Sequence, residues 1–108
     1  MAILTPTQAN KLKSLGTSLS PNEDPTIMAS AATIAPTYYE TRVSGTVAID
    51  TVTLPGTDFS GSIVLIPTAI WTLTTAGNVG LAATAVVGKA MTLTYNQGAG
   101  KWYPSYIA

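Results

Sequence analysis

Acidic side chains are the first candidates for chemistry in this sequence, because its 108 residues include neither histidine nor cysteine. Glu23 and Asp24 could join Asp50 or Asp58 as a pair of acids for general acid–base catalysis, or as oxygen ligands for a cation. All four lie in or beside turn-forming sequence, where carboxylates ordinarily complete turns and keep the surface soluble. We therefore expect no catalytic residue, no metal site and no cofactor.

Two glycine-rich segments, residues 77–80 and 98–100, could in principle cradle a phosphate. Neither ends in the lysine and serine or threonine of a phosphate-binding loop, and neither opens a helix after a strand. Both segments therefore predict turns.

Aromatic residues gather at residues 38–39 and 102–106, where they could stack on sugars or bases. Lys101 alone does not make the basic groove that single-stranded nucleic acid needs. The simplest interpretation is that a final hairpin closes the core with these rings. The alternative is contact with a glycan through three residues, Trp102, Tyr103 and Asn96.

A change of pattern near residue 38 divides the chain into an N-terminal arm, residues 1–37, and a β-domain, residues 38–108. The pattern Thr5-Pro6 followed by Gln8 predicts a short helix over about residues 6–15. Ten helical residues are marginal alone, so this helix must dock, either on its own β-domain or on a partner. The residues expected to contact a partner are Leu12, Leu15, Ile27 and Met28.

The rest of the arm is less regular. Residues 17–25 carry turn signals and predict a linker. Residues 27–35 allow two structures, a second short helix beginning near Asp24-Pro25 or an extended segment along a neighbouring subunit.

From residue 42 onward, short apolar runs separated by turn residues predict β-strands. Residues 42–54 form one bent strand or two short ones, because the apolar face changes parity near Asp50. Residues 63–66 are apolar on both faces and should be central. Further strands are expected at residues 69–75, 90–95 and 101–103, with a strand or turn in 79–87. Strands at this spacing predict an all-β fold, an antiparallel sandwich or small barrel.

Charge is scarce: five basic and five acidic residues make up 9% of the chain. The balance gives no net field to attract nucleic acid or an anionic membrane, so neither is an expected partner. The uncharged stretch from Phe59 to Gly88 is interrupted too often for a membrane span. A monomer of this size needs more polar surface, so we expect the chain to associate with itself. The N-terminus lacks the pattern of a secretory signal, which predicts synthesis in a cytoplasm.

Several short motifs follow one another in residues 38–108. They are Val43-Ser44-Gly45-Thr46-Val47-Ala48-Ile49, Leu54-Pro55, Gly61-Ser62-Ile63-Val64-Leu65-Ile66-Pro67, Leu73-Thr74-Thr75-Ala76-Gly77-Asn78, Leu93-Thr94-Tyr95 and Lys101-Trp102-Tyr103-Pro104-Ser105-Tyr106. In the order and spacing of these motifs, residues 38–108, about two thirds of the chain, resemble a domain that recurs in structural proteins of tailed bacteriophages.

The resemblance implies a non-enzymatic virion protein, made in the host bacterial cytoplasm, that assembles as a homotrimer and binds other virion proteins. A capsid decoration (cement) protein on the head surface, with the major capsid protein as partner, is the expected function, because the chain has neither a repetitive shaft nor a heptad run. The alternative is a short head-fibre or tail-fibre protein that binds host glycans. An enzyme, a third class, would have to work with aspartate and glutamate alone.

Overall fold

A computed structural model describes residues 19–56 and 59–108, and in that part of the chain every regular element is a β-strand. The helix predicted over residues 6–15 lies outside the described residues. The strands are β1 (Ser20–Ala29), β2 (Thr33–Ile34), β3 (Tyr38–Ser44), β4 (Thr51–Val52), β5 (Gly61–Pro67), β6 (Thr72–Leu73), β7 (Ala83–Thr84), β8 (Met91–Asn96) and β9 (Lys101–Pro104).

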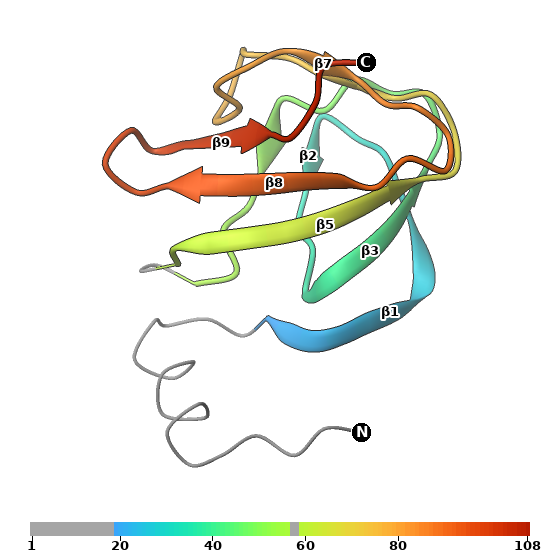
Figure 1. Ribbon diagram of the computed structural model, residues 1–108, viewed down its shortest axis with the longest axis horizontal. Coiled ribbons are helices and arrows are strands. Elements are labelled where there is room, and N and C mark those ends of the chain that lie inside the picture. Colours follow the sequence, from blue (N-terminus) through green and yellow to red (C-terminus); the bar gives the residue numbers. More distant parts are fainter. Residues whose placement is uncertain (1–18, 57–58) are drawn as a thin grey trace.

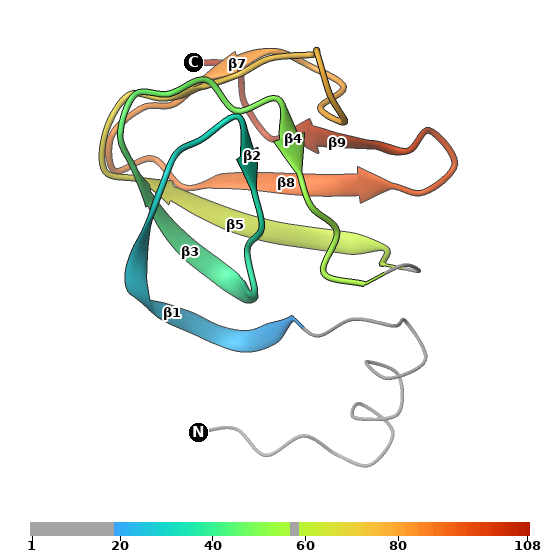
Figure 2. The same cartoon turned by 180° about the vertical axis from the view of Figure 1, so that it is seen from behind.

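Five of these strands form one mixed sheet in the order β1-β3-β5-β8-β9 (Figure 1). The antiparallel arrangement expected from the sequence is wrong for half of it: β1, β3 and β5 are parallel, whereas β5, β8 and β9 are antiparallel. The connections explain the parallel half. Each passes through a short strand outside this sheet, β2 and then β4, and so returns the chain to the end where the previous strand began (Figure 2).

Parallel pairing also occurs among the short strands. β2 pairs with β4, and an isolated parallel bridge joins Ile49 to Leu73 of β6. Val43 is the partner of Pro67 in the large sheet, so the pairing has the same offset of 24 residues at Val43 and at Ile49. Residues 43–49 and 67–73 therefore run side by side in the same direction.

Several sequence expectations are confirmed. Residues 42–54 form two separate strands, β3 and β4, and residues 63–66 lie in β5, the central strand of the sheet. The final hairpin joins β8 to β9, and Gly100 in its turn has φ +67°, a backbone conformation that favours glycine. The uncertain segment 79–87 contains β7, which pairs with β6.

The predicted N-terminal arm, residues 1–37, contains two strands, β1 and β2. β1 pairs with β3 and β2 pairs with β4, so residues 20–34 join sheets built from the β-domain. Residues 27–35 contain no helix and are largely extended. β1 is an exposed edge strand, and its prolines, Pro21 and Pro25, offer no N–H to a further strand.

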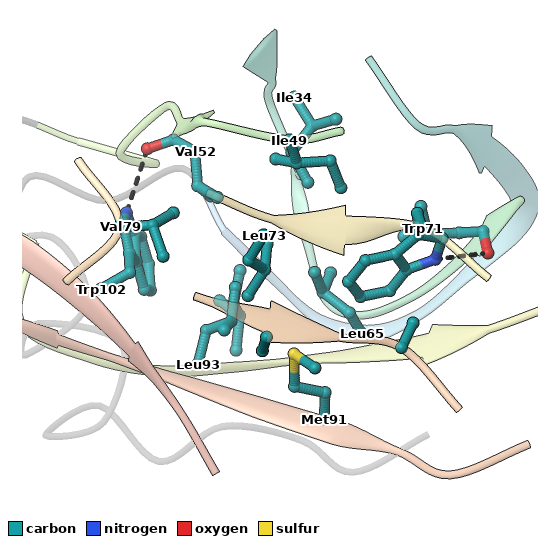
Figure 3. Close-up of a cluster of buried hydrophobic side chains, with 14 of the residues drawn as sticks. Ile34, Ile49, Val52, Leu65, Trp71, Leu73, Val79, Met91, Leu93 and Trp102 are labelled. Atoms are coloured by element: carbon teal, nitrogen blue, oxygen red, sulfur yellow. Dashed lines mark hydrogen bonds between the residues drawn. The ribbon is translucent and has the colours of Figure 1, made fainter. Parts of the chain in front are cut away.

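The core lies between the large sheet and the small ones, and alternate residues of β3, β5 and β8 are buried in it (Figure 3). Both tryptophans are fully buried in it, and each indole N–H donates to a backbone carbonyl. Trp71 Nε1 donates to Val43 O at 3.1 Å, and Trp102 Nε1 donates to Val52 O at 3.0 Å. A buried indole needs such a partner, so the two bonds fix the rings while their faces fill the core.

Candidate functional site

Two of the acidic candidates, Asp24 and Asp50, accept hydrogen bonds from nearby threonines. Asp24 Oδ1 accepts bonds from the N–H and the hydroxyl of Thr26, both at 2.8 Å, and Asp50 Oδ1 accepts from the Thr51 hydroxyl at 2.8 Å. Asp58 lies outside the described residues. Within residues 19–56 and 59–108, no three acidic residues come close enough to hold a metal ion. Asp24 and Asp50 thus accept hydrogen bonds from threonines one or two residues away.

Glu23 and Glu40 are opposite each other in the β1–β3 pair, on the sheet face that points away from the core. Like charges in this position repel each other modestly. Arg42, two residues along β3, donates instead to the carbonyl of Pro25 at 3.2 Å.

The aromatic residues divide between core and surface. The Trp102 ring lies 5.6 Å from Phe59 and 5.2 Å from Tyr95, centroid to centroid, and is 0% exposed. It closes the core, as the simplest interpretation of the sequence predicts. Of the three residues suggested for glycan contact, Tyr103 and Asn96 are exposed and Trp102 is not. Asn96 Oδ1 accepts from the N–H of Ala99 in the hairpin turn.

The residues expected to contact a partner have different surroundings. Leu12 and Leu15 lie outside the described residues. Ile27 is half exposed on edge strand β1, whereas its neighbour Met28 packs against the core. In the described part of the chain, Ile27 is therefore the one of the four whose side chain is open to a partner.

The most prominent apolar feature of the described surface was not predicted. Four large aliphatic side chains are 40–58% exposed and lie on three adjacent segments: Val47, Ile70, Val86 and Val87. We call these four residues the apolar row. Residues 43–49 run along one side of residues 67–73, as the shared register shows.

Residues 85–88 run along the other side of residues 67–73. Ala85 N donates to Trp71 O at 2.9 Å, and Gly88 N donates to Pro67 O at 3.0 Å. Figures 1 and 2 both show the three segments together, coloured green, yellow and orange, at one end of the large sheet. Ile70 is on the middle segment, with Val47 on one flanking segment and Val86 and Val87 on the other.

The three segments that carry the apolar row contain no charged residue. Lys89, which follows them, holds its ammonium group 4.2 Å from the centroid of the Tyr106 ring, and the Tyr106 hydroxyl donates to Lys89 O at 2.7 Å. Lys89, and Arg42 before Val43, are thus both engaged within their own subunit. The surface of the row is apolar and electrically neutral.

Each residue of the row stands in sequence among threonines and alanines, so no single segment looks like a surface patch. The row arises only when the three segments come together. The sequence contains only an indirect signal of an exposed apolar surface. It has a long uncharged stretch and few charged residues to cover the surface of the folded chain.

No helix in the described part of the chain is long and apolar enough to cross a membrane. No protein-family model matches the sequence, and neither does any curated protein or solved structure.

Proposed function

We propose that this chain is a structural virion protein of a tailed bacteriophage, a homotrimeric decoration protein that binds the outside of the capsid and carries out no chemistry. The observation that carries the proposal is the composition of the described surface. Nine large hydrophobic side chains are exposed on it, the four of the apolar row among them, beside six charged residues that are not buried. Such a surface favours contact with other proteins over a monomeric state in solution.

A β-sandwich is the architecture that we infer for the trimer's subunit. The five-stranded sheet forms one layer, and the two small sheets, joined edge to edge by the Ile49–Leu73 bridge, form the second. The buried side chains of both layers belong to one cluster, which supports this interpretation.

The proposed mechanism is thermodynamic. A trimer seated where capsid subunits meet adds buried contacts that exist only in the assembled shell. Because it binds the assembled state and not the dissociated one, it shifts the equilibrium toward the shell. No catalytic group is needed for this effect, in keeping with a chain that has no histidine and no cysteine.

The N-terminal segment is the proposed capsid contact, through Leu12 and Leu15, and Ile27 of β1 is a further proposed contact. The test is co-sedimentation of the full chain with heads from which the protein has been stripped. A chain that lacks residues 1–18 keeps all of β1, which begins at Ser20. We expect it to remain folded and trimeric but to stay in the supernatant.

A matched pair of variants separates the leucines from the rest of the segment. Leu12→Ala with Leu15→Ala should lose binding, whereas Thr7→Ala with Ser14→Ala should keep it. Retention of binding after removal of residues 1–18 would contradict the role of this segment. Failure of the intact chain to sediment with heads would contradict the decoration function itself.

A fibre protein that binds host glycans is the second candidate, and the exposed face of Tyr103 beside Gly80 favours it. An aromatic ring open on one face is a common platform for a sugar. A glycan array distinguishes the two functions. A consistent series of related glycans, lost in Tyr103→Ala, supports the fibre protein, and the absence of any hit supports decoration.

A further inference from the structure

We propose that the apolar row is where the copies of this chain meet, each row packing against the same row of the other two copies around the threefold axis. This inference rests on the homotrimer of the proposed function and assigns its interface. It names Val47, Ile70, Val86 and Val87 as the residues that hold the trimer together.

The first support is that the row is apolar and held in place before any partner arrives. Its exposed side chains extend from segments whose backbones are tied together: Thr68 N donates to Val43 O at 2.9 Å, and Gly88 N donates to Pro67 O at 3.0 Å. Trp71, next to Ile70, is anchored by its own bond to Val43 O. Because these segments lose little conformational entropy on association, most of the free energy gained by burial of the row contributes to affinity.

The second support is charge. A surface near a rotation axis meets copies of itself, so a charged group there faces like charges from every other copy. Segments 43–49, 67–73 and 85–88 contain no charged residue. The three charged residues that flank them are engaged within their own chain: Lys89 with the Tyr106 ring, Arg42 with Pro25 O and Asp50 with the Thr51 hydroxyl. The row is therefore compatible with itself, which is the condition that a partner identical to the chain imposes.

Other surfaces meet this condition less well. The outward face of the large sheet carries Glu23 opposite Glu40, which would meet further carboxylates in a symmetric contact. The outer edge of β9 is already paired, because Trp102 N donates to Asn78 O and Gly80 N donates to Trp102 O, both at 2.8 Å. Edge strand β1 carries two prolines.

Cysteine cross-linking tests the inference directly, because the natural chain contains no cysteine. Ile70→Cys and Val87→Cys each place one thiol in the row of the full-length chain. Leu81→Cys is the matched control, an exposed aliphatic residue on the far side of β7 from Val86. Under mild oxidation at low micromolar concentration, we expect rapid disulfide-linked pairs from Ile70→Cys or Val87→Cys and at least tenfold slower linking from Leu81→Cys. Equal rates at all three positions would overturn the inference.

Charge insertion tests the same contact without cross-linking. Ile70→Glu and Val87→Glu each bring three carboxylates together in the proposed interface, while Leu81→Glu does not. We expect the first two to lower the native mass threefold, from trimer to monomer, with an unchanged circular dichroism spectrum. The positions are 58% and 57% exposed, so either variant should fold.

The outcomes separate this inference from the proposed function. If the natural chain and both row variants remain trimers, the row is not the interface and the decoration function is untouched. If the natural chain is a monomer, the inference fails together with the proposed trimer. If the trimer dissociates on charge insertion but never binds heads, the interface stands and the decoration function fails.

Discussion

Asn78 illustrates how single side chains replace missing strands in this molecule. Its amide nitrogen donates to Val52 O at 2.7 Å, and its Oδ1 accepts the Val52 N–H at 2.8 Å, so the side chain satisfies both backbone groups as a neighbouring strand would. Val52 is completely buried, and water cannot take over these bonds. Residues 77–80, predicted to be a turn, instead follow a turn at residues 75–76 and form a bent segment that pairs with β9 at Val79. The pairing of Asn78 to β4 was not visible in the sequence either.

Replacement of Asn78 by alanine should lower the free energy of unfolding by about 2 kcal/mol, because a buried N–H loses its acceptor. Asn78→Asp should not restore stability, since one carboxylate oxygen would face the Val52 carbonyl. Asn22, an exposed residue of β1, provides the control, and Asn22→Ala should change stability by less than about 0.5 kcal/mol. Urea unfolding monitored by tryptophan fluorescence measures all three. Equal losses at the two positions would contradict the role of Asn78.

Thr41 gives a prediction of the opposite sign. Its side chain is completely buried on β3, and its hydroxyl has no hydrogen-bond partner among the described residues. Thr41→Val keeps the shape and removes the unsatisfied group, so it should raise the free energy of unfolding by about 1 kcal/mol. Thr41→Ser retains the hydroxyl, removes a buried methyl and should be destabilising. A loss of stability in Thr41→Val would indicate that the hydroxyl is bonded in solution.

At the scale of elements, the segment 77–80 closes the edge of the large sheet. It runs parallel to β9, with Val79 as the partner of Trp102, and Gly77 fits tightly against the backbone at residues 50 and 51. A Cβ on Gly77 would collide with Asp50 O and Thr51 Oγ1. The connection therefore depends on a glycine whose φ is ordinary but whose surroundings leave no room.

Gly77→Ala should cost about 1–3 kcal/mol, the usual range for overpacking a filled site. Gly98→Ala is the control, because its Cβ would lie 3.3 Å from the movable Oδ1 of Asn96 in an exposed turn. Thermal unfolding of both variants gives the comparison. If Gly77→Ala unfolded at the same temperature as the natural chain, the close packing of this segment against residues 50 and 51 would not exist in solution.

The strands were easier to predict than their partners. Alternation in residues 90–95 and the apolar run at residues 63–66 specify which residues face the core, because that depends on local period. The parallel pairing of β1, β3 and β5 does not follow from any local pattern. It depends on connections that pass through β2 and β4, strands of two residues each, and so little sequence does not specify which strand each of them pairs with.

At the scale of the whole molecule, the same limit applies to the candidate site. Low charge predicts self-association from composition alone, but the apolar row combines residues from three segments separated by up to 40 positions, Val47 to Val87. Of the acidic side chains considered for chemistry, Asp24 and Asp50 bind neighbouring threonines, and Trp102, considered for a glycan under the alternative, lies in the core. The surface that remains is suited to contact with protein.

The native mass of the purified full-length chain tests the account most directly. Light scattering coupled to size-exclusion chromatography should give three times 11.1 kDa, about 33 kDa, over a wide range of dilution. Such a mass agrees with a trimer that hides its uncharged surface against itself. A soluble monomer of 11.1 kDa over the same range would contradict both the trimer and the interface assigned to the apolar row.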